Sequence, residues 1–208
     1  MAAHDDILPL VLVDAPGCPE QVAVLALNRA AAEFCSRSLV LQEYLDPVAV
    51  VPGEWRYELY LPARMTLAVL QSVRLDGREL TPVNDARGRR QWGEHHGPPT
   101  HYGLLTGWRE IALDPTPQAA GELTLLAALA PALTATSLPD LVVNRHFEAL
   151  IAGAMAHIKQ MPNQAWSDPH GSQIALGRFR QLIDEARIEN EYGRAIGSLR
   201  VTPRRFGG

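Results

Sequence analysis

The sequence predicts an α+β fold, in which a helical bundle of three main helices holds an inserted antiparallel β unit and an extended C-terminal tail follows. Hydrophobic periodicity is the first reason, because apolar residues recur at helical spacing near both ends of the chain and at alternate positions between them. Length is the second reason, since 208 residues fit one compact domain. We therefore expect a single domain over residues 1 to 192, with the tail at 193 to 208.

The first helix is predicted at about residues 19 to 37. Pro19 suits a first helical position, and Glu20 complements the positive N-terminal end of the helix dipole. The apolar stripe of this helix consists of Val24, Leu27, Ala31, Phe34 and Cys35. Cys35 is interpreted as a small buried hydrophobe rather than a nucleophile.

The β unit is predicted over about residues 39 to 130, where short β-rich runs are separated by turn residues. In "WRYELYL", the residues Trp55, Tyr57, Leu59 and Leu61 alternate with polar residues, as on the buried face of an antiparallel strand. Asp76 and Gly77 form a two-residue hairpin signal between "VLQSVRL" and "REL".

Residues 83 to 101 have no apolar periodicity and are predicted to form a long loop. A loop of this length is uncommon in a compact domain unless it binds something or packs on a neighbour. Its candidate contact residues combine charge with an aromatic ring, which suits either a single-stranded nucleic acid or a subunit contact. These residues are Arg87, Arg89, Arg90 and Trp92.

Two further helices are predicted at about residues 139 to 161 and 168 to 190. The stripe of the earlier helix is Val143, Phe147, Ile151, Ala154, Ile158 and Met161. Small residues beside the stripe permit close approach of another backbone, within or between subunits; they are Ala149, Ala152, Gly153 and Ala156. The later helix starts with Asp168 as N-cap and Pro169 as its first residue.

The predicted tail has lost helical periodicity and carries no acidic residue. It combines basic side chains with one apolar anchor, which suits docking on a partner with an acidic or apolar site. The candidate docking residues are Arg194, Arg200, Arg204, Arg205 and Phe206.

No motif of a catalytic, cofactor or metal site is found. His95 and His96 are adjacent but have no Cys or acidic cluster to complete a metal site. Phosphate loops, nucleophile elbows and zinc-protease motifs are absent from the sequence. We therefore expect no enzyme activity, no cofactor and no metal, although a small-ligand enzyme whose site is assembled from loops remains a less favoured alternative.

Charge and hydropathy restrict the partners. The formal net charge of -4 argues against a protein that neutralises many DNA phosphates. Arg178, Arg180 and Arg187 of the last helix are mixed with acids, which disfavours a DNA-binding or regulatory module without excluding that alternative. Residues 7 to 13, "ILPLVLV", are too short for a membrane span. Cys18 and Cys35 show no ligand spacing, so a reducing compartment is expected.

Three stretches carry a resemblance to a known family. "PEQVAVLALNRAAAEFCSRSLVLQEYLDPV", "YELYLP" with "VRLDGREL", and "LPDLVVNRHFEALIAGAMAHIKQMPNQAWSDPHGSQIALGRFRQLIDEAR" resemble tailed-phage head-to-tail adaptor proteins, also called connector or neck proteins. The chain is similar to the tail tubular protein A of short-tailed phages, over residues 19 to about 190. The most specific part is "GAMAHIKQMP" followed by "WSDP" and a helix with "FRQLI".

The resemblance implies a structural component of the virion, assembled in the host cytoplasm. Such proteins form a ring, typically a dodecamer, beneath the portal protein, and the ring extends the DNA channel toward the next neck or tail protein. The tail residues would then bind the portal, and the small-residue face would pack subunits. Genomic DNA would pass through without sequence readout, and no membrane would be involved.

Overall fold

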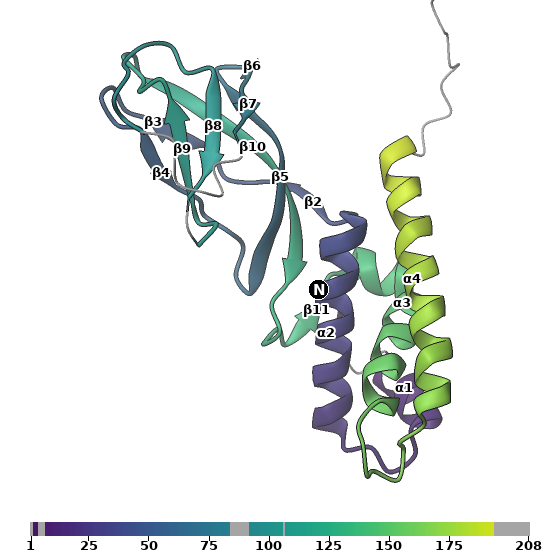
Figure 1. Ribbon diagram of the computed structural model, residues 1–208. Helices are drawn as coiled ribbons and strands as arrows, with labels where there is room; N and C mark the ends of the chain where they lie inside the picture. Colours follow the sequence, from purple (N-terminus) through teal and green to yellow (C-terminus); the bar gives the residue numbers. More distant parts are fainter. Residues whose placement is uncertain (1, 4–6, 84–91, 106, 194–208) are drawn as a thin grey trace, which may run out of the picture.

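The computed structural model describes residues 2–3, 7–83, 92–105 and 107–193. Helices gather at one end and most strands at the other, so the α+β class is confirmed (Figure 1). The described residues form four helices rather than the predicted three. The additional helix, α1 (Leu8–Asp14), comes from the apolar run near the start of the chain and buries Leu8 and Val11 in the helical core.

Helix α2 (Glu20–Ser38) begins one residue later than expected. Pro19 is its N-cap, with an extended ψ of 139°, because its backbone has not yet entered the helix. The helix ends at Ser38, because Leu39 adopts a left-handed conformation (φ 56°) that turns the chain out of the helix, while its N–H still donates to the carbonyl of Cys35. The predicted stripe is confirmed at Leu27, Ala31, Phe34 and Cys35, which are buried, and its first residue, Val24, packs partly buried against the same core.

Helix α3 (Asp140–Lys159) contains a break that its sequence pattern did not predict. His146 has non-helical backbone angles (φ -127°, ψ 26°), and its ring lies 4.9 Å from that of Phe34. A break changes the angular phase of the residues on either side of it. The predicted stripe is therefore wrong at Phe147, whose side chain is 43% exposed, while Leu150 is fully buried instead.

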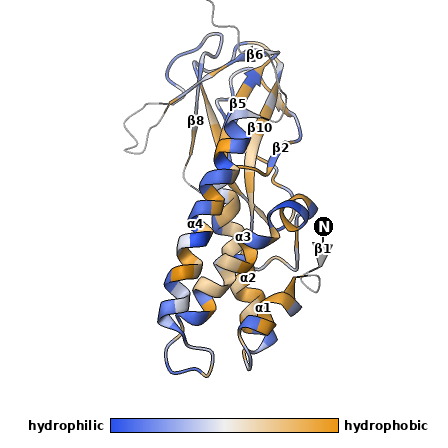
Figure 2. Cartoon of the chain, turned by 90° about the vertical axis from the view of Figure 1, so that its right-hand side faces the viewer, coloured by the Kyte–Doolittle hydropathy of each residue, from blue (hydrophilic) through white to orange (hydrophobic). Residues whose placement is uncertain are grey.

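Helix α4 (Pro169–Tyr192) begins as predicted. The carboxylate of Asp168 accepts the N–H of Gly171 at 2.9 Å, which satisfies a donor that the first turn leaves free. Phe179, Ile183 and Ala186 enter the core shared by the helices. In Figure 2, α2 and α3 are coloured mainly as hydrophobic, whereas α4 carries many hydrophilic residues.

The strands form two main sheets and one small pair. The first sheet has the order β2-β10-β5-β6, and β3 also pairs with β10; its strands are β2 (Gln42–Tyr44), β3 (Val48–Val50), β5 (Met65–Leu75), β6 (Arg78–Glu79) and β10 (Gly121–Pro131). The second has the order β4-β9-β8-β7, with β4 (Arg56–Glu58), β7 (Thr81–Pro82), β8 (His101–Leu104) and β9 (Glu110–Asp114). The small pair is β1 (Ala2–Ala3) with β11 (Ser137–Leu138).

The β unit is mixed rather than wholly antiparallel, which corrects the expectation. β7 and β8 run parallel, with Thr81 opposite His101. Parallel neighbours need a connection of about a dozen residues or more, and the long segment between these two strands provides it. The hairpin prediction is confirmed, since Asp76 (φ 49°) and Gly77 (φ 81°) join β5 to β6.

The described residues form two hydrophobic cores, one in the helical end and one in the β end. Tyr57 and Leu59 are buried in the β core, as the alternation in "WRYELYL" predicts. The long strands β5 and β10 run from the β end toward the helices, and Leu41 packs against both cores (Figure 1). Whether the two cores form a single domain over residues 1 to 192 stays a prediction.

Candidate assembly surfaces

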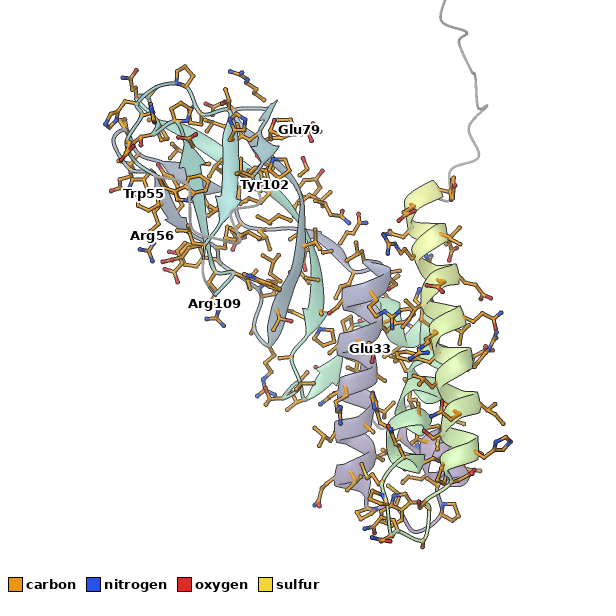
Figure 3. The ribbon with its side chains drawn as sticks, in the orientation of Figure 1. Glu33, Trp55, Arg56, Glu79, Tyr102 and Arg109 are labelled. Carbon is orange, nitrogen blue, oxygen red and sulfur yellow. The ribbon has the colours of Figure 1, made fainter. Side chains whose placement is uncertain are left out.

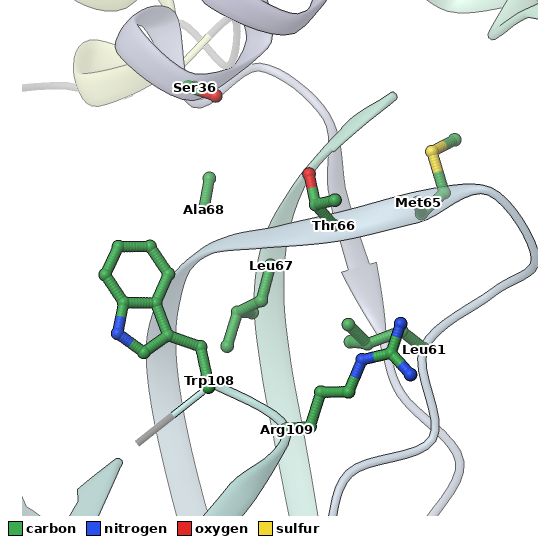
Figure 4. Close-up of a pocket in the computed structure, with 9 residues that line it drawn as sticks. Ser36, Leu61, Met65, Thr66, Leu67, Ala68, Trp108 and Arg109 are labelled. Atoms are coloured by element: carbon green, nitrogen blue, oxygen red, sulfur yellow. The ribbon is translucent and has the colours of Figure 1, made fainter. Parts of the chain in front are cut away.

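A groove of about 470 Å³ lies where the β end meets α2 (Figure 4). Met65 and Leu67 of β5, with Leu61 from the segment before it, provide an apolar wall. Trp108 and Arg109 approach from the turn between β8 and β9. Ser36 of α2 borders the same groove. Apolar side chains beside one arginine make this groove suitable for an occupant that carries both apolar and acidic groups.

Trp108 is the most unusual residue of this groove. Its side chain is 59% exposed, and its φ of 56° lies in the left-handed region that bulky residues avoid. Such backbone strain costs about 1–3 kcal/mol and is found most often at functional sites. Sequence reasoning missed Trp108, although a tryptophan directly after Gly107 in a turn between two strands was an available signal.

A second groove, of about 480 Å³, lies among α1, α3 and α4. Its apolar lining comes from Ile151, Met155 and Ile174, with the small residues Ala152 and Ala175 beside them. Arg178 and Glu148 form an ion pair of 3.2 Å at its edge. The groove leaves apolar surface uncovered on the outside of the helical end, which is typical of surfaces that contact other proteins.

The small-residue face predicted for subunit packing serves mainly the chain's own helices. Ala149, Gly153 and Ala156 are buried within one chain. A Cβ added at Gly153 would lie 2.7 Å from the Cβ of Ala30 and 2.9 Å from the ring of Phe179. Only Ala152 reaches the outer groove, so subunit packing at this face stays a prediction for that residue.

The candidate contact loop is described only in part. Arg87, Arg89 and Arg90 lie outside the described residues, and so do all the candidate docking residues of the tail, Arg194, Arg200, Arg204, Arg205 and Phe206. The ring of Trp92 packs on β8, because a Cβ at Gly103 would lie 2.6 Å from it. A half-buried ring held in this way has less surface for base stacking, and the nucleic-acid and subunit roles of the loop stay predictions.

Trp55 and Tyr102 lie on the same β end (Figure 3). Tyr102 is buried, and burial, with the nearby charge of Glu79 as a smaller cause, raises the pKa of its phenol.

Burial likewise raises the pKa of Cys35 to about 12, so this thiol is a packed hydrophobe at neutral pH. The pKa of His157 is lowered, first by burial and then by the charge of Arg29.

Among the described residues, no three His, Cys, Asp or Glu side chains gather as metal ligands would. On α4, Arg178 pairs with Glu148, and Arg187 pairs with Glu191 at 3.0 Å. Basic groups that are already paired offer less to phosphates. No described helix has the length and hydropathy needed to cross a membrane.

The two open grooves and the exposed Trp108 are candidate surfaces for contact with other proteins. The SU10 adaptor protein family model matches residues 6–204, and the chain therefore belongs to that family. No curated protein matches the sequence. Membership supports the predicted class, a phage structural adaptor of the neck or tail located in the virion, and it suggests a protein that is not an enzyme. It does not confirm the narrower resemblance to tail tubular protein A.

Proposed function

We propose that this protein forms a ring beneath the portal protein and continues the DNA channel from the head of a phage to its tail. The family match over residues 6–204 is the observation that carries the proposal. The ring is taken to be a dodecamer, assembled in the host cytoplasm, with the next neck or tail protein bound on its far side.

The shape of the chain suits such a role. A closed ring of identical subunits needs two different faces on each subunit, one that meets the preceding copy and one that meets the following copy. The groove at Trp108 and the groove at Ala152 belong to different ends of the molecule and have different linings. The molecule thus offers separate surfaces for different neighbouring proteins.

DNA is proposed to pass the ring without sequence readout. A conduit must let the genome slide, and strong phosphate contacts would hold it back. The net charge of -4 supports passage of this kind, as do the ion pairs of Arg178 and Arg187 on α4. Specific binding to duplex DNA at physiological salt would contradict this part of the proposal.

The tail at 193 to 208 is proposed to bind the portal. Ordering a free segment costs about 1–2 kcal/mol of backbone entropy per residue, so the contact must be extensive. The end of α4, which precedes this segment, lies beside the C-terminal end of α2, since Asn190 donates to the carbonyl of Leu39 at 2.9 Å. Basic residues near an apolar Phe206 favour an acidic or apolar portal site.

The test is sedimentation of the purified protein alone, of portal alone and of the mixture. The proposal expects a complex in which several copies bind one portal, with a stoichiometry that saturates. A protein that stays separate from portal at micromolar concentration contradicts the proposed function.

A further inference from the structure

The long strand β5 leaves one edge unpaired. On one side it pairs with β10 from Met65 to Leu75. On its other side, β6 pairs only with Arg74 and Leu75, and the carbonyl of Val73 accepts the N–H of Leu80 at 2.9 Å. Within the described part of the chain, residues 66–72 have no strand neighbour on that side.

This edge carries only one of the features that usually protect a strand edge, since the pairing of β5 with β10 shifts register at Ala68 and at Gln71. Natural edges carry charged side chains, prolines or bulges, because a free row of backbone N–H and C=O groups pairs with other chains. Residues 66–72 read "TLAVLQS", with no charge and no proline. Its unpaired backbone N–H and C=O groups can still pair with a second strand.

The groove at Trp108 lies along the same edge and indicates what the covering strand must carry. Its residues Met65, Thr66, Leu67 and Ala68 belong to β5, and the side chain of Arg109 lies across the groove near Leu61 (Figure 4). No carboxylate of the described residues pairs with Arg109. A matching strand would carry an apolar or aromatic side chain and an acid.

The opposite edge of the same sheet has these properties. β2 is the outer strand there, and all three of its residues are exposed. Glu43 has no basic partner in the described part of the chain, and the aromatic Tyr44 is 67% exposed. We propose that β2 of one copy adds to the free edge of β5 in the next copy, which rests on the proposed ring and names its subunit contact.

For a ring whose axis runs along the strands, the topology gives the direction of this contact. β2 and β5 both run antiparallel to β10, so they point the same way within one chain. A rotation about an axis along the strands keeps that direction, and the intermolecular pair is therefore parallel. The two joined edges are different surfaces, so the contact is head-to-tail. Successive copies form a closed ring when their rotations add up to a full turn. Glu43 of one copy then lies near Arg109 of its neighbour.

A charge exchange tests the contact. Glu43→Arg and Arg109→Glu are made singly and together, and the copies bound per portal are measured by native mass spectrometry. Each single variant places like charges together and should weaken assembly at least about tenfold, while the double variant should return to within about threefold of the original protein. Asp184→Arg and Arg180→Glu, which reverse exposed charges on α4, serve as controls and should assemble normally.

Self-association of the protein alone at high concentration is measured in parallel by sedimentation velocity, so the contact is tested even if portal binding fails. Failure of portal binding alone contradicts the proposed function and leaves the strand contact supported by self-association. If copies of the protein associate neither alone nor on the portal, the strand contact is wrong. It is also wrong if the double variant assembles as poorly as the single ones. If deletion of residues 194–208 weakens self-association while both charge reversals have no effect, the tail occupies the groove and the proposal is wrong. Circular dichroism melting checks that each variant is folded.

Discussion

Replacing Gly153 with alanine tests the packing of the helical end. This glycine lies on α3 where α2 and α4 both approach, and the added methyl would stand 2.7 Å from the Cβ of Ala30. The ring of Phe179, on α4, would lie 2.9 Å from the same added Cβ. Both distances are shorter than ordinary contacts, so the helices must move apart or the side chains must leave their preferred rotamers.

The magnitude follows from two opposing contributions. Inserting a methyl group into a well-packed core costs about 1–3 kcal/mol. Alanine in place of glycine in a helix interior raises the free energy of unfolding by about 1 kcal/mol through its higher helix propensity. The expected result is a loss of up to about 2 kcal/mol in the free energy of unfolding.

Gly177→Ala supplies the matched control. Gly177 is also inside a helix, but an added Cβ there meets no atom within 4 Å. Only the propensity contribution remains, and this variant should gain about 0.5–1 kcal/mol. The two variants should therefore differ by about 1–3 kcal/mol, which is the steric contribution alone.

The assay is urea denaturation followed by circular dichroism at the helix band, with equal slopes for all three proteins. A Gly153→Ala protein as stable as Gly177→Ala would refute the close approach of α2, α3 and α4. A fall in both variants would instead show that the control site is not open.

Three further outcomes are expected. Asp168→Ala should lower the melting temperature by removing the cap of α4, while Asp168→Asn should keep most of the stability at neutral pH. The N–H of Gly171 is the main cause that lowers the pKa of the Asp168 carboxylate, so the original protein should lose this stabilisation as the pH falls below about 4. A melting temperature that responds neither to these substitutions nor to pH contradicts the cap. Cys35 should not react with a thiol reagent at pH 8 in the folded protein and should react fully in urea, because burial raises its pKa to about 12; rapid native labelling would show an open core. Deleting residues 194–208 should leave the melting temperature nearly unchanged and weaken portal binding, and unchanged binding would exclude the tail as the docking segment.

Local signals predicted most of the elements. Asp168 and Pro169 marked the start of α4, and Asp76 with Gly77 marked a hairpin, because these residue types act on their immediate backbone. The alternation around Tyr57 predicted a buried face, since side chains of a strand point alternately to its two sides.

Features that depend on distant residues were not predictable in the same way. The break at His146 changes which residues face the core, and it lies where the ring of Phe34 from another helix packs. The parallel pairing of β7 and β8 depends on the path of a segment without periodicity. At the candidate surfaces, the sequence indicated the small residues of α3 but not that Gly153 is filled by the chain's own Phe179.

The most direct test of the adaptor function is electron microscopy of the protein mixed with portal. The account predicts a ring coaxial with the portal, with an open central channel and the helical and β ends at different heights. Portal particles without a ring, or a protein bound off the axis of the channel, would contradict it.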